Sequence, residues 1–212
     1  MSGIVYLEMN KIHNGVQSYA QRSADNMADV CLMVSLSIQQ NWLGVGDMLA
    51  DVRVNKIGSR FLWGFKADTY SYIMTHKHKI YGQMKAVINS NKSDKDKAVS
   101  LMRVFLRVPG LGLPKAGFMC QLCVGLVGCM DVHNIKLYGL NENALKLPKS
   151  LKNPTKITEK IENYVKLCHD YGTELLWNSW CENLATKSVK WVDGFHVSEV
   201  HYTYLTQKGR LS

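Results

Sequence analysis

Residues 108–133 constrain the fold of this chain more than any other stretch, and they read VPGLGLPKAGFMCQLCVGLVGCMDVH. A tight turn comes first, over Pro109–Gly112, because its two glycines permit positive φ and let the backbone double back. Pro114 suits the first turn of the apolar helix that follows. A helix start behind a glycine-rich turn presents backbone N–H groups to one side, which predicts a phosphate site. Asp131 lies one helix length further along and could return to the same face.

This stretch resembles the signature of the helix-hairpin-helix DNA glycosylase superfamily, the group that includes endonuclease III and 8-oxoguanine glycosylase. In that family the sequence L-P-G-V-G-x-K-x-A leads into an apolar helix, which is followed by V-D-T/V-H. The matching positions here are Val108–Gly112, Ala116 and Met130–His133. A hairpin combined with an Asp-Val-His segment at compatible spacing is fairly specific, whereas a lone GxG would be weak.

The resemblance implies an all-α, two-lobed helix-hairpin-helix fold in which residues 1–212 form a single glycosylase-like unit. Residues 24–130, with the hairpin at 108–115, would form one lobe, and residues 1–23 together with 131–212 the other. In that family the DNA and its extruded base lie in the cleft between the lobes. The expected partner is therefore double-stranded DNA, bound by a monomer.

Composition is compatible with this expectation. The net charge of +9 and the pI near 9.2 favour a polyanionic partner, although many small proteins are basic for no specific reason. We find no signal peptide and no apolar run long enough to span a membrane, so we expect no membrane association. The six cysteines are scattered, which favours free thiols in a reducing cytoplasm.

The hydrophobic pattern predicts helices throughout, and no two alternating runs pair convincingly as strands. The predicted helices are Gln17–Trp42, Asp47–Asn55, Asp68–Asn89, a helix capped by Ser93, Val132–Leu140 and Thr155–Lys187, with a kink or interruption expected at Gly172. Residues 141–154 read as a connector. The whole chain is therefore predicted to be all-α.

Asp131 is the leading candidate for catalysis. Breaking a glycosidic bond builds positive charge on the sugar, and a nearby carboxylate stabilises that charge and can orient or deprotonate the attacking water. The alternative is an Asp that only caps the helix after it. The two roles are compatible, because a capping carboxylate is held rigidly. Given the hairpin, we favour catalysis.

Lys115 stands close to the position where lyase-competent members of the family carry a nucleophilic lysine. That lysine lies two residues after the second hairpin glycine, and here the position is occupied by Pro114, which cannot react. One residue along a helix turns a side chain by about 100°. We therefore expect Lys115 to contact phosphate and the enzyme to be monofunctional, although an alignment shifted by one residue would make Lys115 the nucleophile.

Other DNA-contacting residues follow from the hairpin and from one further segment. Gln39 lies in Leu-Ser-Ile-Gln, similar to a segment where relatives place a glutamine that fills the gap left by the flipped base. Gln40 and Asn41 compete for this role, and a polar helix end explains the segment equally well. The predicted DNA-binding set is Gly110, Leu111, Gly112, Lys115, Gln39, Gln40 and His133. Trp42 and Trp63 are further candidates for residues that line the pocket for the extruded base, although no motif assigns them to it.

Cofactors are not needed for this chemistry. Cys120, Cys123 and Cys129 resemble part of the iron–sulfur loop of some relatives, but no fourth cysteine lies upstream at the required spacing. They fall on the apolar helix, where cysteine behaves as a small hydrophobe. We therefore expect no iron–sulfur cluster and no metal site. A monovalent ion on the hairpin carbonyls remains compatible with the pattern.

Two further functions fit the same sequence. Some phage enzymes that decorate thymine derivatives in DNA resemble this superfamily and transfer groups instead of breaking glycosidic bonds. A non-enzymatic protein could use the hairpin only to bind phosphates, but such a protein would not need Asp131. The lysines of the connector could follow a DNA backbone or form a solvated face, and they are Lys146, Lys149, Lys152, Lys156 and Lys160.

Overall fold

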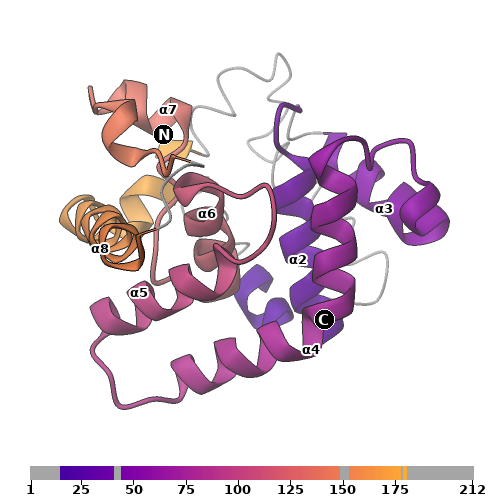
Figure 1. Ribbon diagram of the computed structural model, residues 1–212, viewed down its shortest axis with the longest axis horizontal. Coiled ribbons are helices and arrows are strands. Elements are labelled where there is room, and N and C mark those ends of the chain that lie inside the picture. Colours follow the sequence, from indigo (N-terminus) through magenta and orange to yellow (C-terminus); the bar gives the residue numbers. More distant parts are fainter. Residues whose placement is uncertain (1–14, 41–43, 149–152, 178, 181–212) are drawn as a thin grey trace.

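The computed structural model describes residues 15–40, 44–148, 153–177 and 179–180 (Figure 1). These residues form helices and turns and contain no strand, which confirms the all-α prediction for this part of the chain. The helices are α2 (Ala24–Leu36), α3 (Val45–Asn55), α4 (Phe65–Ile88), α5 (Asp94–Phe105), α6 (Leu113–Cys123), α7 (Val132–Leu137) and α8 (Pro154–Tyr171). Two short 3₁₀ turns, η2 (Lys56–Gly58) and η3 (Glu142–Leu145), follow α3 and α7.

The core forms where α2, α4, α5 and α6 pack together. α2 lies against α4 and α6, and α5 contacts α4, α6 and α8. Figure 1 shows α3 at one side of the molecule, with α7 and α8 at the other. α2 is buried along almost its whole length, since Met27, Val30, Cys31 and Val34 are all fully inaccessible to solvent. Burial of these residues, which recur at helical spacing, places the last turn of α2 deep in the fold.

Helix boundaries follow local signals. The Ser93 side chain accepts a hydrogen bond from the backbone N–H of Asp96, so its predicted capping role for α5 is confirmed. The predicted helix over Gln17–Trp42 is wrong, because it is split. Residues 15–20 are helical, and Ser23 then caps a new helix by accepting from the N–H of Asn26. The helix is interrupted because Ser23 adopts an extended backbone conformation and caps the helix that follows, although apolar residues continue at helical spacing through this region.

The C-terminal helix is also shorter than the apolar pattern predicted. α8 ends at Tyr171, and Gly172 follows it with φ of +87°. Glycine adopts this left-handed conformation at little cost, so the interruption expected at Gly172 is confirmed. Residues 173–177 are helical again, whereas residues 181–187 of the predicted helix lie outside the described chain. No described helix combines the length and apolar character needed to cross a membrane.

Candidate functional site

The hairpin forms the turn between α5 and α6. Gly110 has φ of +79° and is exposed, as the sequence predicted, but Gly112 has φ of −98° and does not use the left-handed region. Gly112 instead begins α6, with its carbonyl accepting from the N–H of Ala116 at 3.0 Å and with Pro114 in the first turn. Leu111 is half-buried. The first turn of α6 has no side-chain cap, and because Pro114 carries no N–H, the backbone N–H groups of Leu113 and Lys115 are the ones without a partner within the helix.

The hairpin is supported from below by the first turn of α4, which the sequence gave no reason to expect. The hydroxyl of Thr69 donates to the carbonyl of Pro109 at 2.7 Å. The ring of Phe65 lies directly beneath Gly110, so that a Cβ at Gly110 would overlap it. A larger residue at Gly110 would therefore have to displace this ring as well as adopt a positive φ. In the sequence, Gly110 indicates only that the turn needs a small residue. It does not indicate that Phe65 and Thr69 would pack against that turn.

Asp131 occupies the N-cap of α7, as predicted. Its Oδ1 accepts from the backbone N–H groups of His133 at 3.0 Å and Asn134 at 3.1 Å. The other carboxylate oxygen, Oδ2, makes no hydrogen bond to a described residue, and the side chain is half-buried. The cap therefore fixes the carboxylate in one orientation and leaves one oxygen available for other contacts. His133 contributes its backbone N–H to this cap.

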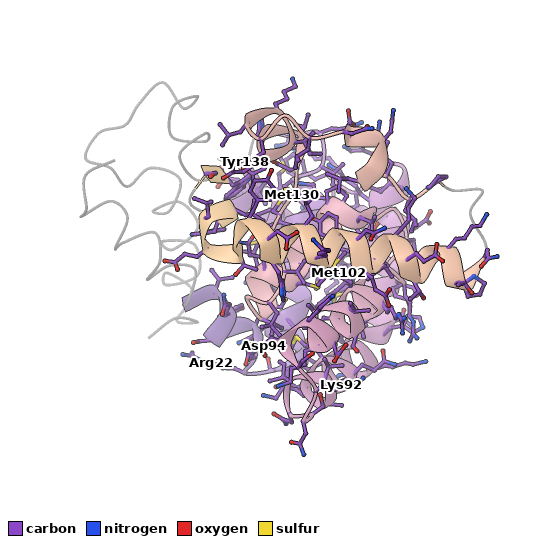
Figure 2. The ribbon with its side chains drawn as sticks, turned by 90° about the vertical axis from the view of Figure 1, so that its left-hand side faces the viewer. Arg22, Lys92, Asp94, Met102, Met130 and Tyr138 are labelled. Carbon is purple, nitrogen blue, oxygen red and sulfur yellow. The ribbon has the colours of Figure 1, made fainter. Side chains whose placement is uncertain are left out.

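The segment that leads into Asp131 is held by three helices. The N–H of Cys129 donates to Gln121 Oε1 of α6 at 2.8 Å, and the N–H of Met130 donates to Tyr164 Oη of α8 at 3.0 Å. Asn134 of α7 completes the set, because its Nδ2 donates to the carbonyl of Cys129 at 2.7 Å. Figure 2 shows Met130 beside α8, and the residue is fully buried. The sequence did not reveal this role for Tyr164 and Gln121.

Lys115 lies in the first turn of α6 and points towards the end of α2. Its Nζ donates to Ser37 Oγ at 3.1 Å and lies 5.4 Å from the centre of the Phe118 ring. Burial raises the pKa of the Cys129 thiol well above its usual range. The Asp131 carboxylate raises it further, and the Lys115 ammonium opposes the shift. Both charged groups therefore lie close enough to Cys129 to act on it, from opposite ends of the 113–131 segment.

The end of α2 brings the predicted gap-filling residues to the same region. Gln39 is exposed and has φ of +57°, an uncommon backbone conformation for a residue other than glycine. Gln40 is also exposed, and its N–H donates to the carbonyl of Ser37 at 3.3 Å. Because Lys115 binds Ser37, the Gln39 turn adjoins the helix that follows the hairpin.

Lys66 is a buried residue that the sequence did not single out. It is 1% exposed, its Nζ donates to the carbonyl of Leu36 at 3.1 Å, and it lies 4.8 Å from the centre of the Trp63 ring. Burial, and then the nearby Lys115 ammonium, lower the pKa of Lys66. Trp63 itself is 46% exposed and contacts Phe65 edge to face. One predicted pocket candidate therefore adjoins the hairpin support, and the other, Trp42, lies outside the described residues.

The cysteines are interior residues. All five that the structure describes are buried free thiols, including Cys120, Cys123 and Cys129. Burial raises the pKa of the Cys168 thiol to about 12 and that of the Cys120 thiol well above its usual range. Within the described ranges, no three side chains of His, Cys, Asp or Glu are grouped as a metal site would require. A buried thiol with a raised pKa stays protonated at neutral pH, so Cys120 and Cys168 behave as small apolar side chains.

The basic residues of the connector are only partly described. Lys146 pairs with Glu142 at 3.0 Å, Lys156 is exposed, Lys160 is half-buried, and residues 149 and 152 lie outside the described chain. A separate surface groove of about 540 Å³ lies between α5 and α8. It is lined by Lys92, Lys95, Asp96, Val99, Ser100, Arg103 and Glu162. Its lining extends from Lys92, just before α5, to Arg103 in the last turn of that helix, and Figure 2 shows Lys92 and Met130 on opposite sides of α8.

Comparisons with known proteins identify no relative of this chain. No protein-family model, no curated protein and no solved structure matches the chain. The candidate site therefore depends on the residues themselves: the hairpin, the capped carboxylate of Asp131, Lys115, and the turn that carries Gln39.

Proposed function

We propose that the protein is a monofunctional DNA glycosylase, which extrudes a damaged or modified base and hydrolyses its N-glycosidic bond. The observation that carries the proposal is Asp131. Its carboxylate is fixed by two backbone N–H groups through Oδ1, while Oδ2 has no described partner. It follows the hairpin by a single helix, in a basic chain with a net charge of +9. The proposal includes a two-lobed arrangement of the chain, a DNA duplex as the partner, and a monomer as the active form.

In the proposed reaction the hairpin N–H groups and Lys115 bind the DNA backbone. The C–N bond between base and sugar then breaks, and the base leaves with the bonding electron pair and takes up a proton from solvent. The carboxylate of Asp131 stabilises the positive charge that develops on the sugar. The oxygen of a water molecule forms the new bond to the same carbon, and it loses a proton to the carboxylate or to solvent. No organic cofactor is required by these steps.

The test is Asp131→Asn, assayed for base release on a panel of duplexes that carry different lesions. The amide keeps the oxygen that caps α7 but removes the charge, so we expect base release to fall by about 100-fold or more, because transition-state stabilisation is lost. Duplex binding should be unchanged or tighter, since ground-state contacts remain. Full activity in this variant would remove Asp131 from the mechanism. A wild-type protein that releases no base from any duplex would refute the proposal.

A further inference from the structure

The last turn of α2 is held by two lysines that come from other helices. Helix C-termini carry unpaired carbonyls and partial negative charge, which cations in the last turn commonly offset. α2 has no basic residue in its own last turn. Lys66 of α4 instead donates to the carbonyl of Leu36, and Lys115 of α6 donates to Ser37 Oγ, each at 3.1 Å.

The contact made by Lys66 requires the greater loss of hydration. A lysine that is 1% exposed loses almost all of its hydration, and its pKa is lowered by burial and by the neighbouring Lys115. Placing two like charges at one helix end is unfavourable unless the carbonyl end of α2 compensates. The buried ammonium therefore fixes the position of the chain at Leu36, three residues before Gln39.

The same turn of α4 also holds the hairpin. Phe65 packs under Gly110 and Thr69 donates to the carbonyl of Pro109, on either side of Lys66 in the sequence. One helical turn, Phe65 to Thr69, thus contacts both segments that would meet DNA. Gln39, at the end of the first segment, is exposed and held at φ of +57°. Backbone in this region persists only where surrounding contacts enforce it.

We propose that Lys66 is a positioning residue: by holding the end of α2 against the support of the hairpin, it directs Gln39 into the DNA duplex at the site of an extruded base. This inference rests on the proposed function, since it assumes that DNA is bound at the hairpin. Lys66 does not touch the DNA. Its effect passes through the carbonyl of Leu36 to the Gln39 turn.

The experiment uses a short duplex with a tetrahydrofuran abasic-site analogue and 2-aminopurine opposite the gap. Entry of a side chain into the gap changes the stacking of 2-aminopurine and therefore its fluorescence. We expect wild-type protein to change the signal on binding, and Gln39→Ala to remove most of the change. Lys66→Met should remove as much as Gln39→Ala does, and the double variant should lose no more than either, because both act through one turn.

The matched control is Lys79→Met, which makes the same substitution at an exposed position of the same helix and should behave as wild type. Affinity of Lys66→Met for a fully paired duplex should stay within about twofold of wild type, because the hairpin contacts remain. Lys66→Gln, shorter by one bond, should give the same fluorescence result and provides a second, milder substitution.

Several outcomes would overturn the inference. They are a wild-type fluorescence change that survives in Lys66→Met, losses that add in the double variant, no change with wild-type protein, or failure of both Lys66 variants to fold. The last would make Lys66 a purely structural residue. The measurement needs no bond cleavage, so it is independent of the base-release assay. A protein that releases no base can still show the coupling of Lys66 and Gln39, and an active glycosylase can lack it.

Discussion

The two ends of α6 differ in almost every physical respect. At its start, Gly112 and Lys115 are half-buried, and no side chain caps the first turn. At its end, Cys120 and Cys123 are fully buried, and both ends of the Gln121 amide are bonded, to the N–H of Cys129 and the carbonyl of Thr173. The buried end fixes the backbone that leads to Asp131, whereas the open end leaves N–H groups available to a ligand. The start of α6 is therefore the more accessible end, and its C-terminal end is the more rigidly held.

The largest effect is expected at Gly117, in the buried part of α6. A Cβ there would lie 2.5 Å from Tyr164 Oη and 2.8 Å from the carbonyl oxygen of Gly128. The backbone carbonyl cannot move cheaply, so Gly117→Ala should lower the free energy of unfolding by about 3 kcal/mol or more. Urea unfolding measures this. Gly82→Ala, in open space on α4, is the control and should stabilise the protein by about 0.5–1 kcal/mol. Equal stability of the two variants would contradict the tight packing.

Tyr164→Phe tests how the buried end controls Asp131. The hydroxyl accepts from the N–H of Met130 and donates to the carbonyl of Gly128, each at 3.0 Å. Its removal leaves the buried N–H of Met130 unpaired, while the carbonyl of Gly128 keeps the Cys168 thiol as a donor at 3.5 Å. The loss should cost about 2 kcal/mol of unfolding free energy. Because Met130 precedes Asp131, the rate of base release should fall while duplex affinity is retained. The control is Tyr171→Phe on the same helix, where no described residue bonds the hydroxyl. If Tyr164→Phe changes neither the rate of base release nor the free energy of unfolding, then α8 does not influence Asp131 through this hydroxyl.

A smaller effect should appear at alkaline pH. The pKa of Cys168 is raised from 9.0 to about 12 by burial, so the folded protein holds this proton more tightly than the unfolded chain does. The resulting stabilisation is complete below pH 9 and is lost as the pH rises towards about 12. Between pH 9 and about 10.5 the loss from this thiol is about 2 kcal/mol. Urea unfolding under reducing conditions should show a shallower decline for Cys168→Ala than for wild type. Parallel declines would show that this thiol does not contribute.

Sequence patterns predicted the local features of the candidate site well. The caps at Ser93 and Asp131 and the positive φ of Gly110 follow from residue type and immediate neighbours. Long-range features were not predictable in the same way. Lys66 bonds a residue thirty positions away and Tyr164 one thirty-four positions away, so neither role leaves a local signal.

The errors have physical causes as well. The helix over residues 17–42 was predicted as continuous because its apolar stripe does not reveal the break at Ser23, where a side-chain cap competes with the helix. Gly112 was expected at positive φ, yet one left-handed residue, Gly110, is enough to reverse the chain. The two-lobed arrangement and the DNA contacts stay predictions.

The smallest effect concerns Lys115, at the open end of α6. Its Nζ bonds Ser37 Oγ, and Pro114 occupies the preceding position in the first turn. Lys115→Ala should weaken duplex binding by about fivefold, as expected for the loss of one phosphate contact worth about 1 kcal/mol, and should spare most base release. Lys79→Ala, on the exposed face of α4, is the matched control for loss of one positive charge.

Borohydride trapping sharpens the same prediction, because it captures only an enzyme joined to DNA through an imine. Imine formation needs an amine that reaches the sugar carbon, and Pro114 offers none at the position where lyase-competent helix-hairpin-helix glycosylases carry a lysine. We therefore expect wild-type protein to leave abasic sites intact and to give no trapped species. A covalent adduct that disappears in Lys115→Ala but persists in Lys79→Ala would make Lys115 a nucleophile. The open end of α6 would then carry chemistry as well as DNA binding, and the enzyme would be bifunctional.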